Sequence, residues 1–262
     1  ITPETKVLCT EAIANPTLKA APIPELAELA HSRGLKLVVD NTFTPMMMSP
    51  AVLGADVVVY SLTKFINGAS DVIAGAICAD KAFIHQLMDL HTGRVMLLGP
   101  TMDPRVAYDV IQRLPHLAIR MREHSRRASR IASRLTELGV NVIYPGLSSY
   151  PQHALVTELL NDGYGYGGIM AIDCGSLEKA DAFMDKLQNE EDFGYIAVSL
   201  GYYDTLISCS SATTSSEIPD EAQAKMGLSQ GLVRMSVGFT GSLEARLAQV
   251  ERAVKAVGLG NA

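Results

Sequence analysis

The residues best placed to do chemistry stand at the ends of two apolar runs. The first run ends at Asp40, and the second is followed by Ser61, Thr63 and Lys64. Short apolar runs rich in valine predict buried strands. In an open α/β sheet the carboxyl ends of parallel strands meet at one edge, so we expect the lysine amine and the carboxylate to face the same ligand.

An amine and a carboxylate in this arrangement suit pyridoxal phosphate. The cofactor requires a lysine for its Schiff base and an acidic partner for its pyridine nitrogen. An opposite charge in contact shifts a pKa by roughly 1 to 3 units, or about 1.4 to 4 kcal/mol, so Asp40 would keep the ring nitrogen protonated. The residues alone leave a second interpretation open, in which Lys64 is an exposed strand-end lysine and Asp40 begins a turn before Asn41.

Longer segments favour the first interpretation. The chain resembles the Cys/Met-metabolism family of pyridoxal phosphate enzymes, through residues 39–43, 54–64, 144–147 and 232–238 and through Glu11 followed by Asn15-Pro16-Thr17. Within that family it is similar to the methionine gamma-lyases of plant type, through residues 197–203 and 208–210. The resemblance implies an α/β protein of fold type I, aspartate-aminotransferase-like, with a mostly parallel sheet in a large domain and a small α+β C-terminal domain.

The resemblance also implies roles for single positions in cofactor binding. Lys64 matches the catalytic lysine that forms the Schiff base, and Asp40 matches the partner of the pyridine nitrogen. Ser61 and Thr63 match the hydroxyl residues that bind the phosphate, and Asn15 matches the residue beside the ring hydroxyl.

Three further positions match substrate-binding residues. Arg234 matches the arginine that holds the substrate carboxylate, with Ser199 supporting it. A guanidinium suits this role because it binds a carboxylate in a bidentate manner and cannot lose its proton. Val198 stands where family members that act on cystathionine commonly have glutamate, so an apolar substrate such as methionine is favoured over cystathionine with its distal ammonium.

These roles imply a carbon–sulfur lyase that converts methionine to methanethiol, 2-oxobutyrate and ammonia. Cystathionine gamma-lyase, cystathionine beta-lyase and cystathionine gamma-synthase activities of the same family are the nearest alternatives. An inactive cofactor-binding or assembly subunit is an alternative from another class. It is motivated by the start of the sequence at Ile1, because residues 6–11 already match a strand from the middle of a family domain.

By this resemblance, about the first third of an ordinary family member is missing. That part normally supplies a tyrosine that stacks on the cofactor and protonates the leaving thiolate, backbone groups for the phosphate, and a Tyr/Arg pair donated across a dimer. The chain is therefore expected either to be one piece of a longer protein or to have lost those groups. The resemblance further implies a homotetramer made of two dimers.

Composition narrows the class of protein. The 262 residues are 48% hydrophobic, enough for a substantial core, and the net charge of −6 with a pI near 5.5 gives no general attraction to nucleic acid or membrane. No apolar stretch approaches the ~18 residues of a spanning helix. The four cysteines are widely spaced, so neither a metal site nor a disulfide framework is indicated and a cytoplasmic setting fits.

The periodicity of apolar residues predicts two domains. Strands are expected at residues 6–9, 35–39, 57–60 and 75–78, alternating with helices at 24–32 and 81–90, which is typical of a parallel sheet. A long helix at 104–138, interrupted at Pro115, is expected to lead into the second domain. There, strands at 140–144, 169–173 and 233–237 alternate with helices at 177–187 and 243–256. We expect residues 1–117 to belong to the cofactor-binding domain and residues 118–262 to form the small domain.

Arginines crowd the long helical segment. They are Arg113, Arg120, Arg122, Arg126, Arg127, Arg130 and Arg134. Binding of a polyanion is one interpretation of such a cluster. A solvated or intersubunit face is favoured, because the segment also contains Glu123 and the chain is acidic.

Overall fold

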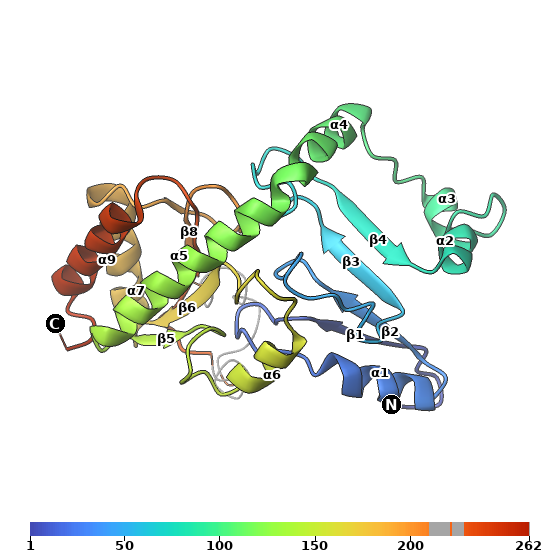
Figure 1. The fold of residues 1–262 in the computed structure, drawn as a ribbon, viewed down its shortest axis with the longest axis horizontal. Helices are drawn as coiled ribbons and strands as arrows, with labels where there is room; N and C mark the ends of the chain where they lie inside the picture. Colours follow the sequence, from blue (N-terminus) through green and yellow to red (C-terminus); the bar gives the residue numbers. More distant parts are fainter. Residues whose placement is uncertain (210–220, 222–227, 262) are drawn as a thin grey trace.

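The described part of the chain contains two sheets, and one long helix connects them (Figure 1). The structure is a computed structural model and describes residues 1–209, 221 and 228–261. The first sheet has four strands in the order β1-β2-β3-β4, and the second has five in the order β5-β6-β9-β8-β7. Helices pack against strands of both sheets (Figure 1).

The first sheet is mostly parallel, as expected. Its strands are β1 (Val7–Glu11), β2 (Lys36–Asp40), β3 (Val57–Ser61) and β4 (Gly75–Ala79). The pairs β1–β2 and β2–β3 are parallel, whereas β4 runs antiparallel to β3, which the alternation of strands and helices did not predict. The physical reason lies in the connection. The segment between β3 and β4 contains turns and no helix, and parallel pairing needs a crossover of a dozen or more residues that is usually helical.

Four helices accompany this sheet. They are α1 (Ile23–Ser32), α2 (Lys81–Leu87), α3 (Arg94–Leu98) and α4 (Pro104–Arg113). A proline stands in the first turn of α1 and of α4, where its missing N–H costs no hydrogen bond. The side chains of Asp80 and Asp103 cap α2 and α4 by accepting hydrogen bonds from backbone N–H groups of the first turn.

The long helical segment is interrupted where Pro115 predicts it. After α4, a 3-10 turn (Leu114–His116) leads into α5 (Leu117–Glu137), which is 21 residues long. The first turns of α5 bury Leu117 and Met121 in the core of the first sheet. Its later turns bury Ala128, Ile131, Ala132 and Leu135 in a second core. The helix α5 therefore belongs to both cores and connects them.

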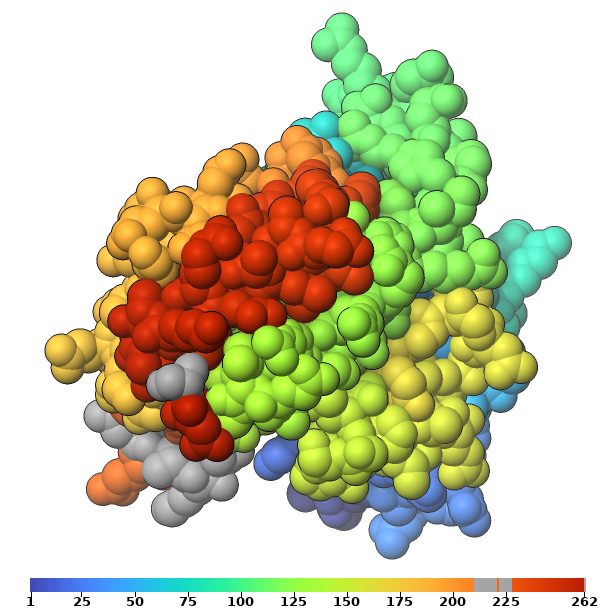
Figure 2. Space-filling view, turned by 60° about the vertical axis from the view of Figure 1, so that its left-hand side comes forward, coloured from blue at the N-terminus to red at the C-terminus, as the bar shows by residue number. Residues whose placement is uncertain are grey.

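The second core surrounds the second sheet. Its strands are β5 (Asn141–Ile143), β6 (Ile169–Asp173), β7 (Tyr195–Ile196), β8 (Leu206–Cys209) and β9 (Leu232–Ser236), and all pairs are antiparallel except β7–β8. The helices α7 (Leu177–Asp185) and α9 (Leu243–Val257) pack in this core, with a π-helical turn (Lys186–Glu190) after α7, whereas α6 (His153–Leu159) buries Val156 and Leu159 in the first core. Figure 2 shows α9 lying along α5, and residues of the two helices are in contact. Of the subfamily motif at 208–210, Ser210 lies outside the described residues.

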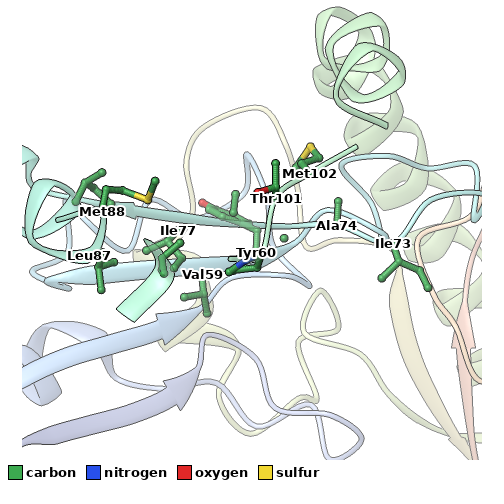
Figure 3. A pocket seen from close by; sticks show the side chains of 14 residues that line it. Val59, Tyr60, Ile73, Ala74, Ile77, Leu87, Met88, Thr101 and Met102 are labelled. Carbon is green, nitrogen blue, oxygen red and sulfur yellow. The ribbon is translucent and has the colours of Figure 1, made fainter. Parts of the chain in front are cut away.

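An apolar groove of about 650 Å³ lies on β3 and β4 (Figure 3). Residues of β3, β4, α2 and the segment before α4 line it, among them Tyr60, Ile77, Met88 and Met102. Ile73, at its edge, is 93% exposed. Among the described residues, no helix is long and apolar enough to cross a membrane.

Candidate active site

The carboxyl ends of three adjacent strands bring acidic and hydroxyl groups to one edge of the first sheet. Glu11, Asp40 and Ser61 are the last residues of β1, β2 and β3, and Glu11 pairs with Asp40 in the strand register. Thr42 links two of these ends: its N–H donates to Asp40 Oδ1 (2.8 Å), and its Oγ1 accepts from the N–H of Ser61 (2.8 Å). Sequence reasoning assigned no role to Thr42.

Lys64 lies in a tight turn directly after β3, which we call the lysine turn (residues 62–68). The Lys64 N–H donates to Ser61 O (3.3 Å), and Lys64 O accepts from the N–H of Gly68 (2.8 Å). The Thr63 hydroxyl is tied to the start of the next strand, because it accepts from Ala74 N–H (3.1 Å) and lies 3.4 Å from Ala74 O. The backbone of this turn thus has a defined geometry, which fixes where the lysine side chain begins.

The Lys64 amine points toward the second sheet. Its Nζ donates to Ser199 Oγ at 3.0 Å. Burial, followed by the positive charge of Arg234, lowers the pKa of the Lys64 amine below its usual value of 10.5. A lower pKa leaves more of the amine neutral near physiological pH, and the neutral amine is the form that attacks a carbonyl carbon.

Arg234 is a buried cation held by neutral groups. Its side chain lies on β9 and the residue is 2% exposed. Nη2 donates to the carbonyl oxygens of Val198 and Ser199 (2.9 Å each), and Nη1 donates to Asn15 Oδ1 (3.1 Å). Within the described part of the chain its Nε–H has no acceptor and no carboxylate pairs with it. Burial lowers the pKa of Arg234 to about 10.

A buried guanidinium without a carboxylate partner is costly, because its hydration is lost and no opposite charge replaces it. A carboxylate ligand would supply the missing charge and an acceptor for the Nε–H of Arg234. The surroundings of Arg234 therefore match those of an anion-binding arginine better than those of a purely structural residue.

Asn15 and Glu11 connect the arginine to the strand ends. Glu11 Oε2 accepts from the Asn15 N–H (2.9 Å), while the Asn15 side chain accepts from Arg234. Burial, and the charge of Asp40 as a smaller cause, raise the pKa of Glu11, while its hydrogen bond from Asn15 lowers it. The contact between Asn15 and Arg234 spans 219 positions in the sequence, so spacing alone could not reveal it.

The loop that carries Val198 and Ser199 packs against the lysine turn. Gly201 in this loop has φ +74°, and a Cβ there would lie 2.4 Å from the backbone N of Phe65. Only glycine allows so close an approach. The Val198 side chain is 61% exposed beside these residues, while its carbonyl oxygen binds Arg234.

The residues present fit pyridoxal phosphate. Lys64 offers an amine with a lowered pKa, and Asp40 ends an adjacent strand as a carboxylate. Arg234 presents an unsatisfied buried Nε–H on the same side as the lysine, since both bind the 198–199 segment. No hydrogen bond joins Asp40 directly to Lys64 within the described residues.

The fold places the chain in the class of pyridoxal phosphate proteins of fold type I. A family model described as Cys/Met metabolism PLP-dependent enzyme matches residues 1–255. The chain belongs to this family, which confirms the resemblance seen in its motifs.

Individual relatives agree with the family match. Over 249 residues the chain is 54% identical to methionine gamma-lyase of Arabidopsis thaliana, covering 95% of this chain and 56% of the relative. It is 36% identical over 243 residues to cystathionine gamma-lyase of Bacillus subtilis (strain 168), covering 91% of this chain and 61% of the relative.

A solved structure of cystathionine gamma synthase from Xanthomonas oryzae pv. oryzae, in complex with aminoacrylate and cysteine, superposes with a TM-score of 0.87. The sequence identity is 33%, and the match covers 97% of this chain and 64% of that one. The chain therefore has the fold of this family but spans only 56–64% of the length of these three proteins.

Proposed function

We propose that the protein containing this chain is a carbon–sulfur lyase that eliminates methanethiol from methionine and releases 2-oxobutyrate and ammonia with the uptake of one water. The observation that supports this most is the contact between the Lys64 amine and Ser199 beside a buried Arg234 that has no carboxylate partner among the described residues. The 54% identity to a protein named methionine gamma-lyase supports the choice of reaction.

When bound, pyridoxal phosphate supplies an electron sink for the bonds at the substrate α-carbon. Lys64 is the residue we assign to its covalent attachment. Asp40 would keep the pyridine nitrogen protonated, Ser61 and Thr63 would bind the phosphate, and Asn15 would lie beside the ring hydroxyl. The neutral partners and the burial of Arg234 support its assignment to the substrate carboxylate.

In the proposed reaction, Lys64 Nζ moves protons. With the cofactor bound, the Lys64 amine would take the proton from the substrate Cα and assist proton transfer at Cβ. Ser199, which accepts a hydrogen bond from Lys64 Nζ, would orient the amine for these proton transfers. The acid that protonates the leaving thiolate is assigned to no residue of this chain, and we expect it from the part of the longer relatives that the chain does not match.

The proposal is tested by turnover. The protein expressed from its complete coding sequence, loaded with pyridoxal phosphate, is given methionine, and methanethiol and 2-oxobutyrate are measured against a Lys64→Ala control. Formation of both products at equal rates, absent in the control, is expected. Cofactor binding without product formation from any sulfur amino acid would instead support an inactive cofactor-binding or assembly subunit.

Cystathionine is the second candidate substrate. It is favoured by the 36% identity to a protein named cystathionine gamma-lyase and by the superposition on a cystathionine gamma synthase. The same turnover experiment with cystathionine, and with a homoserine ester plus cysteine for the synthase reaction, separates these activities from methionine elimination.

We further propose a homotetramer of two dimers in the cytoplasm, and a domain boundary between residues 117 and 118. The exposed apolar groove on β3 and β4 supports assembly, since a protein seldom leaves such a surface in water. The 3-10 turn between α4 and α5 lies close to this boundary, and the first turns of α5 still pack in the first core. Sedimentation of the complete protein tests the first statement, and limited proteolysis with cleavage mapped near residue 117 tests the second.

A further inference from the structure

Arg120 is a second buried arginine that has no acidic partner in the described part of the chain, and it lies on α5 rather than on a strand. It is 8% exposed, although the sequence suggested a solvated or intersubunit face for the arginines of this segment. Its Nη1 donates to Phe65 O (2.5 Å) and its Nη2 to Ile66 O (2.8 Å). Both carbonyls belong to the lysine turn, directly after Lys64.

The remaining contacts of Arg120 are also neutral. Nε donates to His116 Nδ1 (2.9 Å), and Nη2 lies 3.3 Å from Arg113 O. No carboxylate of the described residues forms an ion pair with it. Burial, followed by the charge of Arg113, lowers the pKa of Arg120 to about 10. Burying a cation without an opposite charge costs free energy of desolvation. The binding of Arg120 to consecutive carbonyls therefore indicates a role other than general stabilisation of the fold.

The geometry of the lysine turn supplies that reason. The hydrogen bond from Gly68 N–H to Lys64 O closes one helical turn, whose following carbonyls point out of its carboxyl-terminal end. A cation is favoured at such an end, and a planar guanidinium can bind two neighbouring carbonyls at once.

The turn is also shaped to receive the guanidinium. Gly68 has φ +76°, and a Cβ at this position would lie 2.4 Å from Arg120 Nη1. From the other side, Gly68 O accepts from the N–H of Tyr203 (3.1 Å), in the loop that carries Ser199. The lysine turn is thus held between α5 and the 198–203 loop.

We propose that Arg120 is a positioning residue for Lys64. It holds the Phe65 and Ile66 carbonyls and so fixes the lysine turn in the orientation that directs the amine at Ser199 and the cofactor. The inference rests on the proposed role of Lys64. It adds that the helix connecting the two cores sets the position of the amine, since the contacts of Arg120 with the lysine turn are to its backbone.

A neighbouring arginine provides a matched control. Arg127 lies two turns further along α5, is likewise 8% exposed, and likewise donates to two backbone carbonyls, those of Thr240 (2.9 Å) and Gly241 (2.8 Å). These carbonyls are remote from the lysine turn in the chain. Unlike Arg120, Arg127 also pairs with a carboxylate, because its Nε donates to Glu123 Oε1 (2.6 Å). Arg120→Lys and Arg127→Lys keep the charge and remove the fork that binds two carbonyls, so both should lower the melting temperature.

The test measures two quantities in the complete protein. The first is hydrogen–deuterium exchange of a peptide covering residues 62–68 in the cofactor-free state. The second is the rate at which added pyridoxal phosphate gives a borohydride-stable adduct on Lys64, followed by kcat and KM with methionine. For Arg120→Lys we expect at least about tenfold faster exchange in this peptide, and adduct formation and kcat lower by about 10- to 100-fold at a similar KM. Arg127→Lys should change none of these more than about twofold.

The results distinguish the positioning role of Arg120 from the proposed function of the protein. Equal exchange in the two variants, or faster exchange with unchanged adduct formation and kcat in Arg120→Lys, overturns the positioning role. If the unmodified protein forms no adduct on Lys64, the proposed function fails. The exchange measurement then still decides whether Arg120 holds the lysine turn.

Discussion

The Lys64 amine and the Ser199 hydroxyl are 3.0 Å apart although 135 positions separate them in the chain. Lys64 comes from the turn after a strand of the first sheet, and Ser199 from a loop that joins strands of the second. The same loop supplies two carbonyl oxygens to Arg234. The candidate site is therefore completed between the two sheets, and neither sheet contains all of it.

The surroundings of the Lys64 amine predict how cofactor attachment depends on pH. Because burial and the Arg234 charge lower the pKa of this amine, attachment should reach its half-maximal rate at a lower pH than attachment to a free lysine side chain. Removing the charge with Arg234→Met should shift the midpoint back toward higher pH. The measurement is the rate of the absorbance change on adding pyridoxal phosphate between pH 6 and 10, and a midpoint that does not differ from that of a lysine peptide would contradict the assignment.

The covalent link itself should require Lys64. In the Lys64→Ala variant, borohydride treatment followed by peptide mass spectrometry should find no pyridoxyl group at any position, whereas the unmodified protein should carry it in the peptide that contains residue 64. Circular dichroism checks that the variant is folded. A specific adduct on another lysine of the variant would remove Lys64 from its proposed role.

Asp40→Asn separates cofactor binding from turnover. The Asp40 carboxylate accepts a hydrogen bond from Thr42 N–H, which an asparagine carbonyl can also accept, so the turn after β2 should survive. A neutral amide cannot stabilise a protonated pyridine ring. We therefore expect cofactor to remain bound and kcat to fall by roughly 10- to 1,000-fold, in line with the loss of a contact that shifts a pKa by about 1 to 3 units. Undiminished kcat would exclude Asp40 from the reaction.

A buried histidine predicts an acid sensitivity of the fold. His124 on α5 is 0% exposed, its Nδ1 lies 2.6 Å from Val237 O, and its ring packs edge-on against those of Phe65 and Phe239. Burial lowers the pKa of His124 from 6.5 to about 4, and the charges of Arg120 and Arg127 add to this effect.

The sign of the pH effect follows from this lowered pKa. The unfolded chain takes up the proton near pH 6.5 and the folded chain only near pH 4, so His124 contributes its full stability above pH 6.5 and loses it as the pH falls toward 4. The slope from this one group is at most about 1.4 kcal/mol per pH unit. Urea unfolding between pH 7.5 and 5 measures it, and His124→Gln should flatten the curve. An identical slope in both proteins would mean that other groups cause it.

Much of the fold could be read from the sequence because its signals are local. Valine-rich runs ending at Asp40 and Ser61 mark strands of the first sheet, and Pro115 marks the break before α5. The antiparallel direction of β4 depends instead on how a loop without a helix returns to the sheet. The very short β7, whose two residues pair with β8, carries no periodic pattern that could be recognised.

For the candidate site too, the sequence predicts some features and leaves others unrecognised. The types of Lys64 and Arg234 and the motifs around them point to their chemistry without a structure. The burial of Arg120 could not be foreseen, because its partners are backbone carbonyls, which every residue has and no sequence pattern reveals. The helical spacing of arginines predicted a charged face, and only the packing of α5 against the lysine turn and against residues 240–241 distinguishes the buried Arg120 and Arg127 from the exposed arginines.

The choice of substrate should depend on Val198. Its side chain is 61% exposed, next to the Ser199 that binds the Lys64 amine, and its carbonyl oxygen binds Arg234, so a ligand held by Arg234 would extend past it. Valine offers the terminal methyl group of methionine an apolar neighbour. It offers the distal ammonium of cystathionine no partner, which costs about 1 to 3 kcal/mol, or roughly a tenfold to 100-fold penalty.

Val198→Glu should shift this preference toward cystathionine. In the complete protein we expect kcat/KM for methionine to exceed that for cystathionine, and the ratio to move toward cystathionine by about 10- to 100-fold in the variant, because a carboxylate then meets the ammonium. Val198→Gln, of similar size and without charge, is the matched control and should move the ratio much less. A preference of the unmodified protein for cystathionine, or equal shifts in the two variants, would show that the side chain at position 198 does not select the substrate by its charge.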